Sequence, residues 1–71
     1  MAKLNVLPTL SPRERELIRG VVAGQTYPQI ANTLGLSLET IKSYSARLRS
    51  KLGVSNKVQL ALWGAAHKEC C

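Results

Sequence analysis

Four cations stand close together near the middle of the chain: Lys42, Arg47, Arg49 and Lys51. A single acid, Glu39, precedes them. An ammonium group binds an anion as a point charge, and a guanidinium fork donates two parallel hydrogen bonds to a phosphate or a guanine edge. Such groups bind a polyanion well only if one rigid element presents them on one side. The chemistry of this region therefore depends on the element that holds the cations.

Residues 26–52 are predicted to form two helices joined by a tight turn. Ala31, Gly35 and Ile41 have the spacing of a helix-turn-helix. Ala31 is small where the next helix crosses, Gly35 suits a turn with positive φ, and Ile41 enters the core. Ser37 caps the second of these helices, which should end at Gly53.

A helical wheel divides the helix over 38–52 into two faces. The predicted core face holds Ile41, Ser45, Leu48 and Leu52, with Tyr44 beside it. The opposite face holds Glu39, Lys42, Ser43, Ala46, Arg47 and Ser50, with Arg49 and Lys51 at its edges. This division predicts a helix that lies in the major groove of DNA. The alternative is a basic helix whose charges only confer solubility.

Two further helices are predicted, which makes the fold class all-α with four helices. Ser11, Pro12 and Glu14 form a capping box that starts the first helix, and Gly24 should end it. Its core stripe is predicted to be Leu17, Ile18, Val21 and Val22. Thr26 caps the second helix, which runs to about Leu34, and Ser55 is predicted to cap the fourth, which runs to about Ala66 or His67.

The fourth helix is apolar around much of its girth and so needs two surfaces to cover it. One would be the domain core, and the other a second copy of the chain. The predicted dimer stripe is Val58, Ala61, Leu62 and Ala65. Ala61, Gly64 and Ala65 are small enough for two helices to approach closely. Trp63 is either a core residue or an interface anchor. A monomer with a buried fourth helix is the alternative.

The bulk properties restrict the class of protein. The 71 residues suffice for one small domain, and a net charge of +6 favours nucleic acid or an anionic membrane as partner. No apolar stretch is long enough to cross a membrane, and no signal peptide is present, so a cytoplasmic protein without a membrane partner is expected. No nucleophile–base pair, carboxylate dyad or phosphate loop indicates an enzyme or a cofactor. His67, Cys70 and Cys71 lack a fourth ligand, so no metal site is expected.

The chain resembles the LuxR-type (GerE-type) helix-turn-helix domain of bacterial transcription regulators over about residues 10–67. The matching stretches are LSPREREL at 10–17, Gly24, QIANTLGLS at 29–37, Thr40-Ile41-Lys42 and KLGV at 51–54. The resemblance implies a recognition helix in the major groove and dimerisation through the fourth helix on a site with two-fold symmetry. The residues outside this range are expected to form an N-terminal arm over 1–9 and a C-terminal tail over 68–71. Met1 and the tail favour a natural stand-alone protein over a fragment.

The resemblance also assigns residues to DNA contacts. Lys42 matches the family's basic contact residue, Ser43 and Ala46 fall at base-contacting positions, and Thr26, Thr40 and Lys51 match positions near phosphates. Tyr44 replaces the usual His, and Ala46 replaces a longer side chain. The complete predicted DNA-contacting set is Thr26, Thr40, Lys42, Ser43, Tyr44, Ala46, Arg47, Arg49 and Lys51.

The predicted function is a dimeric regulator that binds a near-palindromic DNA site. RNA polymerase is a further possible partner. The alternative is an interaction module that pairs with a longer family member through its fourth helix and modulates it. A pure inhibitor of that kind would not need the cations of the 38–52 helix, and this chain keeps them.

Overall fold

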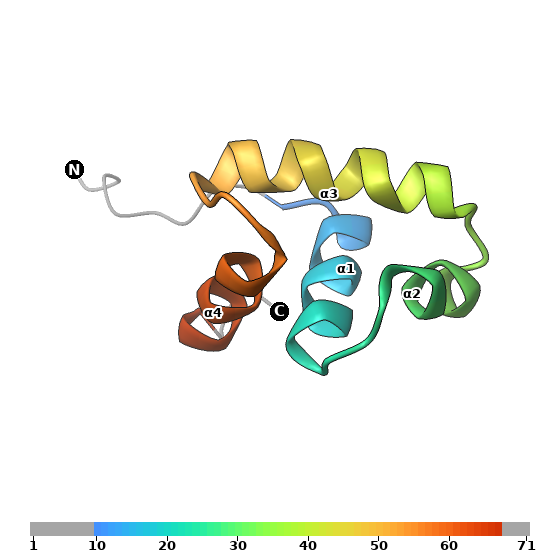
Figure 1. The fold of residues 1–71 in the computed structure, drawn as a ribbon, viewed down its shortest axis with the longest axis horizontal. Helices are drawn as coiled ribbons and strands as arrows, with labels where there is room; N and C mark the ends of the chain where they lie inside the picture. The colour runs from blue at the N-terminus through green and yellow to red at the C-terminus, as the bar shows by residue number, and fades with distance from the viewer. Residues whose placement is uncertain (1–9, 68–71) are drawn as a thin grey trace.

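The computed structural model describes residues 10–67, and these residues form four helices and no strand (Figure 1). The helices are α1 (Pro12–Val22), α2 (Tyr27–Leu34), α3 (Leu38–Leu52) and α4 (Lys57–Ala66). This confirms the predicted all-α fold. The predicted arm over 1–9 and tail over 68–71, with Cys70 and Cys71, lie outside the described residues.

Two helices begin with the capping boxes that the sequence predicts. At α1, the Ser11 hydroxyl accepts a hydrogen bond from the backbone N–H of Glu14, and the Glu14 carboxylate accepts one from the backbone N–H of Ser11. At α2, Thr26 and Gln29 make the same pair of bonds. Each box satisfies two backbone donors that a helix start leaves without partners. Local sequence thus determines where α1 and α2 begin.

The start of α4 differs from the prediction by one residue. Its N-cap is Asn56, not Ser55: the Asn56 side-chain oxygen accepts the backbone N–H of Gln59 at 2.9 Å. The Gln59 side chain in turn accepts the backbone N–H of Ser55 at 2.7 Å. Asn and Ser cap helices about equally well, so two adjacent capping residues leave the start uncertain by one position.

The turn between α2 and α3 has the predicted geometry. Gly35 ends α2 with φ of 70°, a left-handed conformation that strains any residue with a Cβ. The backbone N–H of Leu36 then donates to the carbonyl oxygen of Ala31 at 2.9 Å, which closes the turn. Gly24 also ends α1 as predicted: it follows the C-cap Ala23 with φ of 85°, and the backbone N–H of Gln25 donates to the carbonyl oxygen of Gly20 at 3.0 Å.

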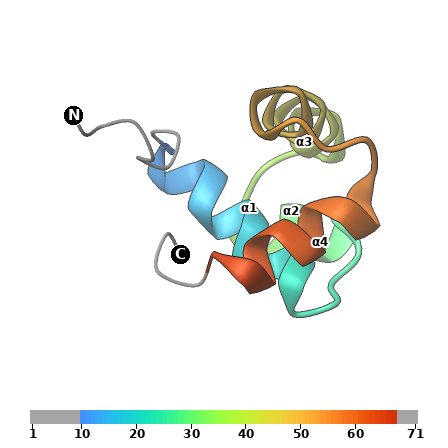
Figure 2. The same ribbon diagram turned by 90° about the vertical axis from the view of Figure 1, so that its left-hand side faces the viewer.

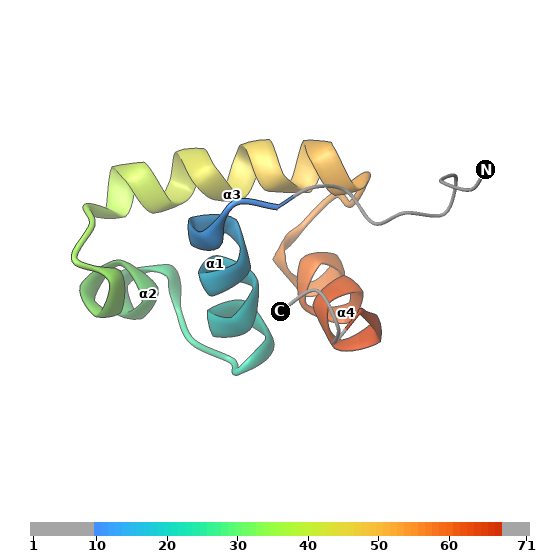
Figure 3. The same cartoon turned by 180° about the vertical axis from the view of Figure 1, so that it is seen from behind.

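The longest helix, α3, lies across one side of the molecule, and the other three lie together on its opposite side (Figure 1). A view along α3 shows this separation most clearly (Figure 2). From behind, α1 lies between α2 and α4 (Figure 3), and it packs most extensively against α4. The fully buried apolar side chains come from all four helices: Leu17, Ile18, Ile30, Ile41, Leu48 and Leu60.

The contact between α1 and α4 corrects two expectations. A Cβ on Gly64 would lie 2.6 Å from Ile18 Cγ2 and 2.7 Å from Val22 Cγ2. Gly64 is therefore small because α1 of its own chain approaches it, not because a second chain does. Val22, expected in the core stripe, is 44% exposed, because it lies at the margin of this contact. Trp63 packs partly buried against the core of its own chain.

Candidate nucleic-acid interface

The two faces of α3 are those that the helical wheel predicts. Ile41, Ser45 and Leu48 are fully buried, and Leu52 packs against the core from its edge. This buried face fixes which way the opposite face points, and the other three helices leave it uncovered (Figure 2). The exposed residues of that face are Glu39, Lys42, Ser43, Ala46, Arg47 and Ser50.

Arg47 and Tyr44 lie against each other at the edge of α3 nearest to α1. The Arg47 guanidinium carbon is 5.5 Å from the centroid of the Tyr44 ring, a cation–π geometry. Together with Ser11, Arg13 and Glu14, these side chains line a shallow hollow between α1 and α3. The stacking restrains the Arg47 side chain, although the residue as a whole is exposed.

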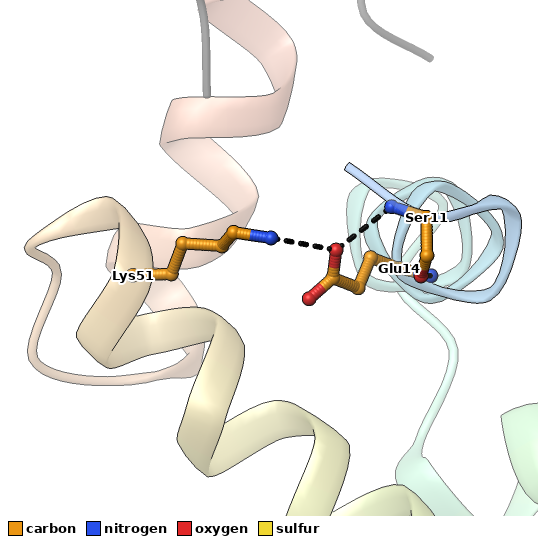
Figure 4. Close-up of polar contacts among 3 residues, drawn as sticks. All are labelled: Ser11, Glu14 and Lys51. Atoms are coloured by element: carbon orange, nitrogen blue, oxygen red, sulfur yellow. Dashed lines mark hydrogen bonds and ion pairs between the residues drawn. The ribbon is translucent and has the colours of Figure 1, made fainter. Parts of the chain in front are cut away.

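The other two cations of α3 contact groups of their own chain. Arg49 Nε donates to the backbone oxygen of Ser45 at 3.4 Å, so this side chain lies along its own helix. Lys51 Nζ is 3.0 Å from Glu14 Oε1, which connects the last turn of α3 to the start of α1 (Figure 4). Of the four cations, Lys42 and Arg47 are exposed on the outer face of α3, whereas Arg49 is half-buried and Lys51 is paired with Glu14.

The surroundings of the Glu14 carboxyl shift its pKa. Burial disfavours the carboxylate and alone would raise its pKa. The backbone N–H of Ser11 and the ammonium group of Lys51 outweigh that effect, and the Ser11 hydroxyl adds to them, so the pKa of Glu14 lies below its usual value. Both donors reach the same carboxylate oxygen (Figure 4). Glu14 therefore stays ionised, and it serves the α1 cap and the Lys51 ion pair together.

The two predicted phosphate contacts from threonine lie at or near helix starts. The Thr26 hydroxyl accepts the backbone N–H of Gln29 at 3.2 Å and is exposed as the N-cap of α2. The Thr40 hydroxyl lies 2.9 Å from the hydroxyl of Ser37, the N-cap of α3. Helix starts carry partial positive charge, which favours a nearby phosphate.

One polar contact was not predicted from the sequence. The Tyr27 hydroxyl of α2 is hydrogen-bonded to the Ser45 hydroxyl on the buried face of α3. On the same ring, Lys57 Nζ of α4 lies 4.9 Å from the centroid. A signal for this contact does exist in the sequence, because a serine on a predicted core face needs a hydrogen-bonding partner. Its partner is distant in sequence, so the pattern alone does not identify it.

The outer side of α4 differs in chemistry from that of α3. Val58 is 69% exposed and Leu62 is 64% exposed, and Ala65 is exposed beside them. Ala61, the fourth residue of the predicted dimer stripe, is half-buried and packs against the core. The exposed apolar row of α4 is therefore Val58, Leu62 and Ala65.

Two further findings concern the residues from 10 to 67 only. No helix in this range is long and apolar enough to cross a membrane. The same range contains no group of three His, Cys, Asp or Glu side chains that could hold a metal ion.

Several transcriptional regulatory proteins are similar to this chain in sequence. The chain is 38% identical over 71 residues to the transcriptional regulatory protein TdiR of Thauera aromatica, a match that covers 96% of this chain and 31% of TdiR. It is 44% identical over 52 residues to the probable transcriptional regulatory protein NarL of Mycobacterium tuberculosis, covering 73% of this chain and 24% of NarL. The transcriptional regulatory protein UhpA of Escherichia coli matches at 44% over 52 residues, covering 73% of this chain and 26% of UhpA.

The chain thus spans about a third or less of the length of these relatives. Residues 8–64 match the family model GerE, described as bacterial regulatory proteins of the luxR family. This match covers most of the chain and includes all of α1, α2 and α3. The chain therefore belongs to the luxR family of bacterial regulatory proteins.

Proposed function

We propose that this chain regulates transcription by inserting α3 into the major groove of double-stranded DNA. The observation that carries the proposal is the outer face of α3, where Lys42 and Arg47 are exposed while Ile41, Ser45 and Leu48 hold the opposite face in the core. A helix fixed in this way presents its cations to a groove without rearrangement. The transcriptional regulators among its relatives support the same function.

The outer residues divide into base-reading and phosphate-binding roles. Lys42 and Arg47 donate to guanine O6 or N7, Ser43 adapts to either base type, and Ala46 contacts a thymine methyl group. Residues at the margins bind phosphates on the two walls of the groove. These are Thr26, Thr40, Tyr44, Arg49 and Lys51.

The exposed apolar row of α4 supports a dimer as part of this proposal. Val58, Leu62 and Ala65 on one copy would cover the same residues on a second copy around a two-fold axis. Ala61, half-buried, would contribute at the margin. The DNA site should then be near-palindromic, with half-sites about 10 bp apart or a multiple of that spacing. Such a protein works in the cytoplasm, where bacterial DNA lies.

The same apolar row favours a second function. A longer relative with a similar fourth helix would be an equally suitable partner, so the chain would pair with it and modulate it. RNA polymerase is the other protein partner that we consider. Neither partner requires a change in α3.

Selection from a pool of random duplexes at two salt concentrations tests the proposal. We expect an inverted repeat to be enriched, and binding to weaken steeply with salt because the cations displace counterions from the phosphates. Arg19→Ala is the control for loss of one charge, since Arg19 lies in the last turn of α1, at the end away from α3 (Figure 1). It should select the same sequence as the wild type.

The other outcomes separate the two functions. Salt-sensitive binding without an enriched sequence would contradict sequence-specific recognition. Absence of DNA binding at both salt concentrations would contradict the DNA-binding function. Capture of a full-length relative by the wild type, lost in a Leu62→Glu variant, would then support the pairing function.

A further inference from the structure

Ser45 is the one described polar side chain in the buried core, with no exposed surface at all. It lies on α3 between Ile41 and Leu48, where an apolar residue would fill the same space at a lower cost of desolvation. A buried hydroxyl is tolerated when it has a hydrogen-bonding partner. Ser45 has one in the hydroxyl of Tyr27.

Tyr27 contacts two other helices from the first turn of α2. Its hydroxyl reaches Ser45 in the middle of α3, and the Lys57 ammonium group of α4 lies 4.9 Å from the centre of its ring. The ring itself is half-buried against the core. Tyr27 also directly follows Thr26, the exposed cap of α2. One side chain thus connects the start of α2, the middle of α3 and the start of α4.

We propose that Tyr27 is a positioning residue for DNA recognition, which acts through Ser45 to fix the rotation of α3 about its own axis. Apolar packing is non-directional, so it permits a packed helix to rotate slightly about its own axis. A hydrogen bond has a preferred distance and angle, so a single buried one removes that freedom. Lys57 stabilises the ring that carries the hydroxyl.

The rotation matters because the reading residues lie on the far side of the helix from Ser45. Side chains extend about 5–6 Å from a helix axis, so a rotation of about 10° moves their ends by about 1 Å. Bidentate recognition of a base requires positions held within about 0.5 Å. A loose α3 would keep its charge and its affinity for phosphates, but it would discriminate poorly between bases.

The proposal rests on the proposed reading function of α3, and three variants test it. Tyr27→Phe removes the hydroxyl and keeps the ring, Ser45→Ala removes the other partner, and the double variant removes both. Val21→Ala is the control for lost stability, since Val21 is buried in α1 and takes no part in the Tyr27–Ser45 hydrogen bond. The measured quantities are the melting temperature and the ratio of dissociation constants for a scrambled duplex and the selected site.

We expect Tyr27→Phe to lower that ratio about tenfold, which corresponds to about 1.4 kcal/mol. The decisive variant is the double one. It should regain much of the melting temperature, because no buried hydroxyl is left without a partner. Its ratio should stay as low as that of Tyr27→Phe, because the directional contact is still absent. Val21→Ala should lower the melting temperature and leave the ratio unchanged.

Two results would overturn the proposal. One is a double variant that regains both stability and discrimination. The hydrogen bond between Tyr27 and Ser45 would then contribute no more than ordinary core packing. The other is a Val21→Ala variant with the same loss of discrimination, which would make the effect a general consequence of instability.

A measurement on the DNA-free protein separates this proposal from the proposed function. Relaxation-dispersion NMR detects motion on the microsecond to millisecond scale. We expect exchange broadening of α3 backbone amides in Tyr27→Phe and in the double variant, but not in the wild type or in Val21→Ala. If the wild type shows no sequence preference, the proposed function fails and this measurement still decides the role of Tyr27. Unbroadened α3 amides in Tyr27→Phe would refute that role.

Discussion

Two helices of this small domain, α3 and α4, share one core and present opposite chemistries to their surroundings. The outer face of α3 carries the exposed cations Lys42 and Arg47. The outer row of α4 carries Val58, 69% exposed, and Leu62, 64% exposed. Charged groups suit a polyanion, whereas an exposed apolar row suits another protein surface. Under the proposed function, DNA binding and pairing would therefore be carried by separate helices.

The buried sides of the two helices differ as well. That of α3 contains a hydrogen-bonded hydroxyl, Ser45, and that of α4 contains Gly64, which leaves no space for a Cβ. The first contact is directional, and the second depends on shape.

The largest effect is expected from Leu62→Glu. A charge in the centre of the exposed row should prevent pairing of two copies, and a palindromic duplex would then lose the avidity of two linked half-sites, about 100-fold in affinity. Binding to a single half-site should stay the same, because α3 is untouched. Sedimentation of the protein on both duplexes measures this, with Leu62→Met as the apolar control. Equal losses on both duplexes would contradict the separation of the two helices.

Lys42→Ala should weaken DNA binding by about 1–3 kcal/mol. If Lys42 reads a base, the loss falls mainly on the selected sequence and one position of the site becomes tolerant. If it binds a phosphate, all sequences weaken alike and the salt dependence falls by about one charge. Stability should change by less than about 0.5 kcal/mol, because Lys42 is exposed. Titrations at several salt concentrations, beside thermal unfolding, measure both quantities.

Gly64→Ala should destabilise the domain by about 1–2 kcal/mol. The new Cβ would meet Ile18 Cγ2 at 2.6 Å and Val22 Cγ2 at 2.7 Å. Because both contacts are far below van der Waals distance, the cost of overpacking should lie in the upper part of its usual range, about 2–3 kcal/mol, which exceeds the gain of about 1 kcal/mol in helix propensity. Urea unfolding measures the change, and adding Val22→Ala should recover part of it by removing one of the two clashes. A Gly64→Ala domain as stable as the wild type would contradict the close approach of α1 and α4.

The smallest effect concerns Glu14. Its pKa is lower in the folded chain than in the unfolded chain, so ionised Glu14 stabilises the fold. This contribution is present above the unfolded value of about 4.3 and disappears as the pH falls through the folded value. Glu14→Gln should remove it, at a cost of about 0.2–1 kcal/mol near pH 7, as for other partly exposed ion pairs. A stability difference between wild type and variant that persists at pH 2 would contradict this assignment.

The sequence determined the parts of the fold that depend on near neighbours. The capping boxes at Ser11 and Thr26 and the turn at Gly35 involve residues three to five positions apart, so their pattern is visible in the chain. The faces of α3 follow from helical periodicity and are also confirmed. The DNA contacts themselves stay predictions.

The contacts that the sequence did not reveal join helices distant in the chain. Tyr27 and Ser45 are 18 positions apart, and Gly64 meets Ile18 from the far end of the domain. No sequence periodicity reveals either pair. The small size of Gly64 is also compatible with a contact to its own chain or to a second one. The packing of α1 against α4 in the structure shows that Gly64 is in close contact with its own chain.

The close packing of Gly64 against α1 affects how the sequences of such domains can diverge. A larger side chain at Gly64 would disturb α1, whereas Val58, Leu62 and Ala65 are exposed, so changes there leave the packing of α1 intact. If these three residues form the proposed pairing surface, related proteins of one bacterium would avoid mixed pairs through changes in a few outer side chains. The pairing preference would then change without any change in the proposed DNA-contacting face of α3.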